Sequence, residues 1–238
     1  MAKRTRKYWP ALKKTSIWAG GILLATILMV HIYALALRFL PVPTTLNIVL
    51  NASQGTAIER EWVPLEAVSP HLIRAVIAAE DTRFCGHSGV SFEDIQRALD
   101  ERRAGRRLRG ASTLTQQTAK NVFFWNGGGF VRKAGEAWFA LFIDQIWGKR
   151  RVLEVYLNVA EWGDGLYGAE AAAQGRFGKT ARALTAYEAA LLAAVLPSPQ
   201  RYRLDPPSAY VARQARTYRA RMQTVDAQGL AGCVLSAD

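Results

Sequence analysis

The stretch from Ile17 to Leu37 constrains the fold of this chain more than any other feature. It reads IWAGGILLATILMVHIYALAL, 21 residues without Lys, Arg, Asp or Glu. At about 1.5 Å per residue, a helix of this length spans the roughly 30 Å hydrocarbon core of a bilayer. Trp18 and Tyr33 lie near its ends, where such rings favour the membrane interface. The sequence therefore predicts a transmembrane helix over residues 17–37.

A cleaved signal peptide is the alternative interpretation of this stretch, since Ala34-Leu35-Ala36 resembles a cleavage site. The apolar run is longer than the roughly 7–15 residues of a signal-peptide core, which favours a retained anchor. Both interpretations export the rest of the chain.

The flanking charges predict the orientation of the anchor. Arg38 is the only charged residue between it and Glu59, whereas six basic residues precede it: Lys3, Arg4, Arg6, Lys7, Lys13 and Lys14. The positive-inside rule makes residues 1–16 a basic cytoplasmic tail and places everything after the anchor across the membrane. The net charge is +12, of which the tail supplies half. The exported part therefore stays basic, which favours an anionic lipid or a lipid-linked phosphate over nucleic acid as partner.

The 238 residues, half of them apolar, suffice for one substantial domain and an appendage. Residues 38–54 are interpreted as a connector in which Leu46–Leu50 forms a short strand. Residues 55–210 are interpreted as a mainly α domain, because helix signals recur and alternating strands are nearly absent. Residues 211–238 begin as a basic helix and continue as a C-terminal tail.

Helix starts are marked by capping residues. They predict helices after Ser69-Pro70, after Ser91 with Asp94 through Leu99, after Thr113 with Gln116, and after Thr185 with Glu188 up to Pro197. Two further helices are expected over Arg132–Trp147 and Lys149–Asn158. Cys85 and Cys233 fit no zinc or redox spacing, so a disulfide and two free thiols both remain open.

Two adjacent acids, Glu80 and Asp81, end the apolar helix that starts at Pro70. The helix macrodipole is negative at this end, and a second acid adds repulsion. Beside apolar packing, a carboxyl in this place tends to hold a proton, which suits general acid–base chemistry. Simple exposure at a helix end is the alternative. His87 is interpreted as a turn histidine bonded to the backbone, since neither Ser-His-Asp nor zinc spacing surrounds it.

Polar and basic residues recur on the next predicted helices. Ser112, Gln116 and Lys120 are spaced four apart, with Gln117 beside them, so they are predicted to share one helix face. The N–H groups at the start of that helix, next to a lysine, would suit a phosphate. A solvated polar face is the alternative.

The chain continues with further charged and polar pairs on helices. Arg132 and Glu136 are one turn apart; with Lys133 they form either a surface ion pair or, together with Lys120, a cluster of three cations. Glu154 and Asn158, on an apolar helix, are typical of buried structural hydrogen bonds.

Five ordered blocks resemble the peptidoglycan glycosyltransferase family, specifically its monofunctional, membrane-anchored members. They cover roughly residues 60–200: Glu80-Asp81-x-x-Phe84-x-x-His87-x-Gly89; Gly110-Ala-Ser-Thr-Leu-Thr-Gln-Gln-Thr-Ala-Lys120-Asn121; Arg132-Lys133-x-x-Glu136; Val152-Leu-Glu154-x-Tyr156-Leu-Asn158; and Gly168 to Lys179, followed by the helix with Glu188.

The resemblance implies a lysozyme-like helical lobe with a smaller membrane-facing jaw. It implies polymerisation of lipid II, a disaccharide-pentapeptide on a polyprenyl pyrophosphate, into glycan strands at the bacterial inner membrane, with the catalytic domain in the periplasm. The growing glycan chain and other cell-wall synthesis proteins are the further implied partners. The sequence requires no cofactor; because some members respond to divalent cations, Mg²⁺ or Mn²⁺ at the pyrophosphate is an open alternative.

The resemblance also implies roles for individual residues. Glu80 is similar to the general base that deprotonates the acceptor's sugar hydroxyl, which attacks the donor's anomeric carbon with inversion. Glu136 is similar to a second catalytic carboxylate near the leaving pyrophosphate. The remaining implied residues are a charge clamp (Lys120, Arg132, Lys133), pocket-lining groups (Ser112, Gln117, Asn121) and structural motif residues (Asp81, Phe84, His87, Glu154, Asn158).

The sequence departs from the family pattern in two places. Ser91 stands where an aspartate is common, and both residues cap helices. Gly127-Gly128-Gly129 occupies a loop where relatives often carry an arginine, so one phosphate ligand is missing or replaced.

Rival functions follow from the same residues. A lysozyme-like lytic muramidase is one alternative, opposed by the cations, because a cleaved glycan carries no pyrophosphate. An inactive scaffold for cell-wall synthesis is another, opposed by the presence of Glu80. No Ser-x-x-Lys occurs, so no transpeptidase domain is expected.

Overall fold

A long apolar helix, α1 (Trp9–Ala36), opens the part of the chain that the computed structural model describes, residues 9–105, 112–125 and 127–235. Its segment Ile17–Ala36 has a mean hydropathy of 2.0 and is long and apolar enough to cross a membrane. The helix predicted over 17–37 is confirmed, and it extends further towards the N-terminus. The chain divides into two compact units, Met1–Leu40 and Pro41–Asp238, of which α1 belongs to the first.

Helices dominate the second unit, as predicted. Three short strands form one sheet in the order β1-β3-β2, in which β1 is parallel and β2 antiparallel to β3. The described elements are α2 (Leu46–Ser53), β1 (Glu59–Arg60), η1 (Leu65–Ala67), α3 (Pro70–Glu80), η2 (Phe84–Gly86), α4 (Phe92–Arg103), α5 (Leu114–Phe123), α6 (Phe130–Val159), β2 (Glu161–Gly163), β3 (Leu166–Tyr167), α7 (Ala169–Phe177), η3 (Ala181–Ala183), α8 (Ala186–Val195), α9 (Ala209–Ala227) and α10 (Gly232–Leu235).

Residues Leu46–Leu50 form the start of helix α2, so the prediction of a strand here is wrong. The side chain of Thr45 caps the helix by accepting a hydrogen bond from the Ile48 N–H. Ile48 is buried, whereas Leu46, Val49 and Leu50 are exposed. This is the spacing of a helix with one buried face. A short apolar run does not by itself distinguish strand from helix.

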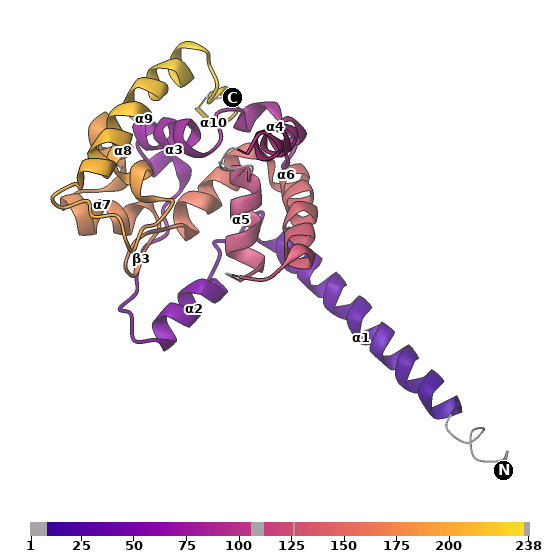
Figure 1. The fold of residues 1–238 in the computed structure, drawn as a ribbon. Coiled ribbons are helices and arrows are strands. Elements are labelled where there is room, and N and C mark those ends of the chain that lie inside the picture. Colours follow the sequence, from indigo (N-terminus) through magenta and orange to yellow (C-terminus); the bar gives the residue numbers. More distant parts are fainter. Residues whose placement is uncertain (1–8, 106–111, 126, 236–238) are drawn as a thin grey trace. The chain divides into compact units, whose positions relative to one another are not determined.

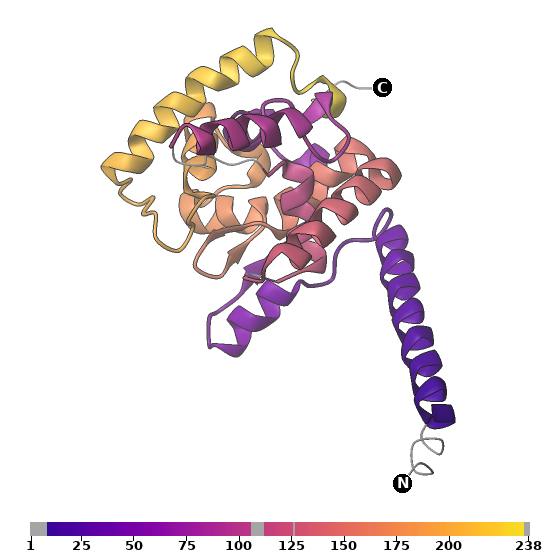
Figure 2. The ribbon, with the colours of Figure 1, turned by 45° about the vertical axis from the view of Figure 1, so that its right-hand side comes forward.

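In the second unit, helix α8 lies at the centre of a hydrophobic core and packs against α3 and α9. Residues 189–195 of α8 are buried without exception. Figures 1 and 2 show α9 running along the outside of this pair. The predicted caps are present: the Ser69 side chain caps α3, and Thr185 forms a capping box with Glu188 on α8. Helix α3 therefore ends at Glu80 with its apolar face packed on α8 and α9.

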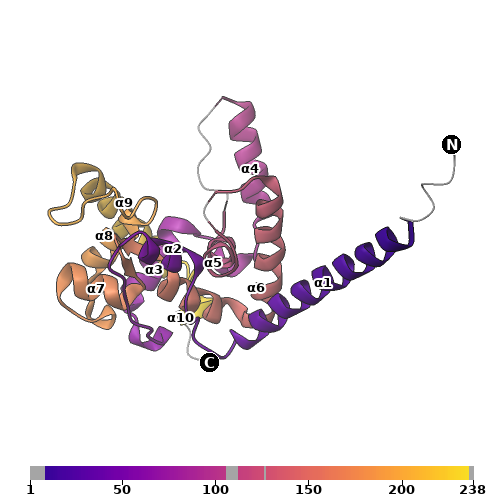
Figure 3. The ribbon, with the colours of Figure 1, turned by 90° about the horizontal axis from the view of Figure 1, so that it is seen from below.

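Helices α5 and α6 pack side by side, which Figure 3 shows nearly along the axis of α5. The predicted capping box of Thr113 and Gln116 starts α5. Helix α6 is two helical halves that meet at Gly148, where φ is 73°. This agrees with the two helices predicted on either side of residue 148. Ser91 caps α4, which runs past the predicted end to Arg103. Residues 106–111, including Gly110 of the second motif block, lie outside the described residues.

A disulfide joins Cys85 of η2 to Cys233 of α10, whose Cα atoms are 5.6 Å apart. The bridge selects one of the two states that the sequence left open. Val234 beside it is buried, and its carbonyl accepts a hydrogen bond from Arg150 at 2.7 Å. The C-terminal segment is therefore fixed to the loop that follows α3.

We expect Cys233→Ser to lower the free energy of unfolding. The bridge closes a loop with a sequence separation of 148 residues, and loss of such a native bridge costs about 2–5 kcal/mol. Denaturant unfolding of the purified domain with and without reductant measures this. Reductant should lower wild type to the level of the variant and leave the variant unchanged. Equal stability of wild type and variant without reductant would contradict the expectation.

We expect Gly89→Ala to destabilise the protein by about 2–4 kcal/mol, because it combines strained backbone with a steric clash. Gly89 has a φ of +79°, and an added Cβ would lie 2.4 Å from the Ala140 carbonyl oxygen of α6. Gly86→Ala is the matched control, since an added Cβ there meets nothing within 4 Å. Thermal unfolding of both variants decides it; similar melting temperatures would refute the steric argument.

Candidate active site

Asp81 connects three segments at the end of α3. Its buried carboxylate accepts a hydrogen bond, at 2.9 Å, from the N–H of Leu114, which is the first residue of α5. The same carboxylate lies 3.0 Å from His87 Nε2. The sequence-based interpretation of His87 as bonded to the backbone is therefore wrong: its partner is the Asp81 carboxylate. Asp81 and His87 fix the start of α5 and the loop after η2 relative to the last residue of α3.

Glu80, the last residue of α3, is mostly buried and accepts a hydrogen bond from Gln117 Nε2 of α5 at 2.8 Å. Burial raises the pKa of Glu80, and the charge of Asp81 raises it further. The Gln117 hydrogen bond and the Lys120 charge act in the opposite direction. The raised pKa agrees with the sequence-based expectation, with burial and not helix position as its main cause. Glu80 is thus a carboxyl suited to accept a proton.

The Glu80–Gln117 hydrogen bond connects the linings of two clefts, since each of these residues lines one of them. The Glu80 cleft has a volume of about 190 Å³ and is lined by Ala78, Ala79, Glu80, Asp81, Thr82, Asp94, Arg97, Ser112, Thr113 and Arg221. The Lys120 cleft, of about 380 Å³, is lined by Asn47, Gln117, Lys120, Asn121, Tyr156, Val159, Ala160, Glu161, Tyr167 and residues 196–201. A group bound in either cleft would lie beside one end of this hydrogen bond.

Three cations gather around the start of α6 and the end of α5. Burial lowers the pKa of Lys120, as does the nearby charge of Arg132. Burial likewise lowers the pKa of Lys133, with Arg132 and Lys120 as further causes. The buried Glu136 forms ion pairs with Arg132 and, at 3.1 Å, with Lys133. The single charge of Glu136 thus compensates only part of the positive charge of these three cations.

The N-terminus of α5 does not offer free N–H groups at Leu114 and Gln116, so this part of the predicted phosphate site is wrong. Asp81 accepts from Leu114, and the Thr113 hydroxyl accepts from Gln116. Ser112 precedes the cap and is not on the helix face with Lys120. Its hydroxyl accepts a hydrogen bond from Lys133 Nζ at 2.8 Å instead.

The remaining motif residues make structural contacts. The Asn158 side chain bonds both backbone groups of Val63, each at 2.9 Å. Glu154 accepts from the Leu65 N–H at 3.2 Å and pairs with Arg151. Phe84 is fully buried, and its ring lies 4.7 Å from Lys149 Nζ. These residues fix the segment before α3 and the loop after it.

The sequence assigned no site role to three residues near Glu80, although Tyr156 belongs to the fourth motif block. The Tyr156 hydroxyl lies 3.3 Å from Gln117 Oε1. Tyr218 of α9 is close enough for the Glu80 charge to raise its pKa, after burial as the larger cause. Arg221 lines the Glu80 cleft. A tyrosine on an apolar helix does signal a buried hydroxyl that needs a partner, but nothing in the sequence distinguishes Arg221 from the other arginines of its basic helix.

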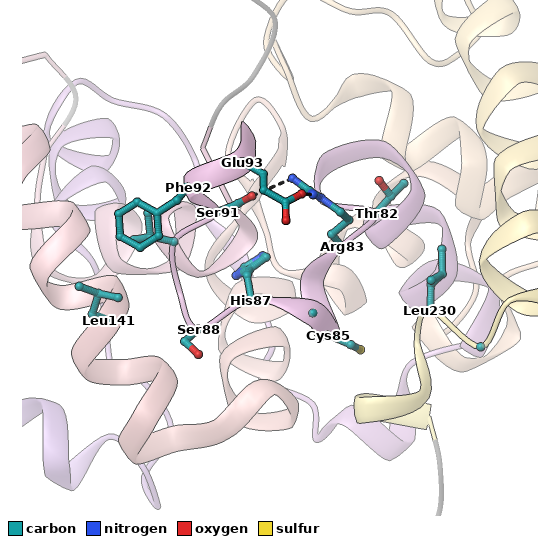
Figure 4. A pocket seen from close by; sticks show the side chains of 13 residues that line it. Thr82, Arg83, Cys85, His87, Ser88, Ser91, Phe92, Glu93, Leu141 and Leu230 are labelled. Carbon is teal, nitrogen blue, oxygen red and sulfur yellow. Dashed lines mark hydrogen bonds and ion pairs between the residues drawn. The ribbon is translucent and has the colours of Figure 1, made fainter. Parts of the chain in front are cut away.

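A larger hollow of about 650 Å³ lies beside η2 and the start of α4. Figure 4 shows His87, Phe92, Leu141 and Leu230 around it, with the Arg83–Glu93 ion pair at its edge. Neither Glu80 nor the cations line this hollow. Volume alone therefore does not identify the site; the carboxylate and cations do.

Comparison with known proteins gives consistent matches. Residues 47–225 match the family described as Transglycosylase. Proteins named biosynthetic peptidoglycan transglycosylase are similar over most of the chain. The one from Rhodospirillum centenum is 49% identical over 91% of this chain and 94% of its own length. The one from Shewanella oneidensis is 52% identical over 71% and 72%, and the one from Jannaschia sp. is 43% identical over 98% and 99%.

Proposed function

The chain belongs to the transglycosylase family, and we propose that its reaction takes place where the Glu80–Gln117 hydrogen bond connects the Glu80 and Lys120 clefts. The chain is a peptidoglycan glycosyltransferase: it polymerises lipid II into glycan strands. Lipid II and the growing glycan are therefore its substrates. The observation that carries the proposal is the hydrogen bond from Gln117 to Glu80, one helical turn before Lys120 on the same helix.

Glu80 acts as the general base. Its ionised carboxylate takes the proton from the acceptor's sugar hydroxyl, whose oxygen then bonds to the donor's anomeric carbon from the face opposite the pyrophosphate. The bond from that carbon to the pyrophosphate oxygen breaks, and the configuration inverts. A carboxylate with a raised pKa is a stronger base than an exposed glutamate. The partial burial of Glu80 beside α9 supports this role, because burial is the main cause of its raised pKa.

The cations stabilise the leaving pyrophosphate. After burial as the larger cause, the Arg132 charge lowers the pKa of both Lys120 and Lys133, so a bound dianion relieves the repulsion among these cations. Fixed charges facing a developing negative charge contribute strongly to rate. Glu136 is 1% exposed and paired with Arg132 and Lys133. We assign it to positioning those cations rather than to contact with the substrate. Ser112, Gln117 and Asn121 line the clefts and supply polar contacts.

A divalent cation is not essential to this arrangement. Within the described ranges no three His, Cys, Asp or Glu side chains are grouped as metal ligands, and Glu136 is already paired with cations. The side chains that the structure describes around the two clefts thus do not fit a resident metal site. If Mg²⁺ or Mn²⁺ acts, the substrate's pyrophosphate oxygens supply its ligands.

The first half of α6 faces the membrane in our proposal. Phe130, Val131 and Trp138 are 87%, 85% and 57% exposed, and Trp125 before them is 48% exposed. Such a patch next to the cations suits a lipid-linked substrate. The helix α1 anchors the chain, and the six basic residues before its apolar segment Ile17–Ala36 support a cytoplasmic N-terminus with the second unit in the periplasm.

We expect Glu80→Gln to abolish polymerisation of labelled lipid II almost completely, by about 10²–10⁴-fold, because the amide accepts no proton. Lys120→Ala should cost about 10²–10³-fold through lost charge stabilisation. Glu66→Gln is the control, an exposed glutamate outside both clefts. Finished glycan serves as a second substrate. Cleavage of it by wild type would favour the lytic alternative. A wild type that neither polymerises lipid II nor cleaves glycan would favour the inactive scaffold, and an active Glu80→Gln would exclude Glu80 as the base.

We expect kcat/KM for lipid II to fall on the acid side with an apparent pKa above 4.5, the ordinary glutamate value. The sign follows because the base must be ionised and burial raises its folded-state pKa. Initial rates between pH 4 and 8, roughly the range in which the protein is expected to stay folded, measure the limb. A limb at or below 4.5 in folded protein would exclude Glu80 as the titrating base.

A further inference from the structure

Tyr156 lies on the second half of α6 with its side chain buried and its hydroxyl at the Lys120 cleft. That hydroxyl lies 3.3 Å from Gln117 Oε1, and Gln117 Nε2 lies 2.8 Å from Glu80 Oε2. The three side chains come from α6, α5 and α3. They form a chain of hydrogen bonds that ends on the proposed base.

The direction of both hydrogen bonds follows from the chemistry of the groups. An ionised carboxylate only accepts, so the Gln117 amide must turn its NH₂ group towards Glu80. Its carbonyl oxygen then faces Tyr156, whose hydroxyl must donate. Burial, and then the Glu80 charge, raises the pKa of Tyr156 well above its ordinary value. The phenol therefore keeps its proton and remains a donor while Glu80 is ionised.

We propose that Tyr156 is a positioning residue for the reaction: its hydroxyl holds the Gln117 amide in the orientation that donates to Glu80. The inference rests on the proposed role of Glu80 as base. Without Tyr156, the amide is free to rotate about its last side-chain bond and present its oxygen to the carboxylate. An oxygen facing the carboxylate would repel its negative charge. Tyr156 thus acts on the base through Gln117 and need not touch the substrate.

Charged and titratable groups from the surrounding elements line the Glu80 cleft or interact electrostatically with Glu80. They are Asp81 after α3, Asp94 and Arg97 of α4, Lys120 of α5, Tyr156 of α6, and Tyr218 and Arg221 of α9. None of the charged groups is altered by removing the Tyr156 hydroxyl. A change in the titration of Glu80 in such a variant therefore reports on the Gln117 hydrogen bond.

The test is the pH dependence of lipid II polymerisation by the full chain carrying Tyr156→Phe. Loss of a hydrogen bond to the ionised form raises a carboxyl pKa. The 3.3 Å contact is longer than an ordinary O–H···O bond, so we expect the acid limb of kcat/KM to move up by about half a pH unit. Tyr167→Phe is the matched control: it removes a hydroxyl from the same cleft, but one whose partner is Asn51 at 2.7 Å.

Gln117→Leu provides the second arm. It should move the limb in the same direction by itself, and adding Tyr156→Phe to it should give no further shift. An unmoved limb in Tyr156→Phe with an unchanged melting temperature would overturn the inference, as would an equal shift in Tyr167→Phe or an additional shift in the double variant. If Tyr156→Phe fails to fold, an unmoved limb in Gln117→Leu overturns it.

Failure of the inference and failure of the proposed function give different results. An active wild type with the same acid limb in every variant refutes only the role of Tyr156. A wild type that does not polymerise lipid II, or a Glu80→Gln variant that does, refutes the role of Glu80 on which the inference rests.

Discussion

The carboxylate of Asp81 is the contact on which the site depends. It is buried at the end of α3 and accepts hydrogen bonds from the start of α5 and from His87. Removing either partner would leave a buried carboxylate under-satisfied, which is costly. Because Asp81 holds the first N–H of α5, the next turns of that helix bring Gln117 and then Lys120 alongside Glu80. The adjacent acids thus have different roles in our proposal: Asp81 assembles the site, and Glu80 accepts the proton.

The charged groups of the site are only partly stabilised by one another in the free protein. Burial raises the pKa of Glu80 and lowers those of Lys120 and Lys133. Both pKa shifts mean that burial disfavours the charged forms of these side chains in the free protein. An anion bound near the lysines would stabilise their charged forms. Glu136 compensates Arg132 and Lys133 only in part. If the pyrophosphate binds here, as we propose, the cation cluster stabilises it most strongly when its charge is greatest, at the moment of departure.

The sequence predicted the features that depend on local chemistry. Capping residues such as Thr113 and Thr185 satisfy N–H groups within one turn, so the starts of α5 and α8 are readable. The break in α6 at Gly148 is also local, because glycine adopts the observed φ of 73° without strain. Contacts between distant segments could not be predicted from local sequence. The disulfide between Cys85 and Cys233 spans 148 residues, and the hydrogen bond from the start of α5 to Asp81 depends on how the helices pack. The prediction of a strand at 46–50 was wrong because a short apolar segment can form either a strand or a helix, depending on its packing.

Helix α9 shows why the catalytic unit cannot be read from the motif blocks alone. The blocks end near residue 200, yet Tyr218 and Arg221 face the base from α9. The position of α9 is fixed by its packing on α3 and α8 and by the Arg74–Asp226 ion pair at 2.7 Å. Beyond it, the disulfide ties α10 to the loop that carries His87. The C-terminal segment thus lies against the same short stretch of chain that begins with Glu80 and Asp81. The burial of Glu80, which raises its pKa, therefore depends partly on α9 residues that lie outside the motif blocks.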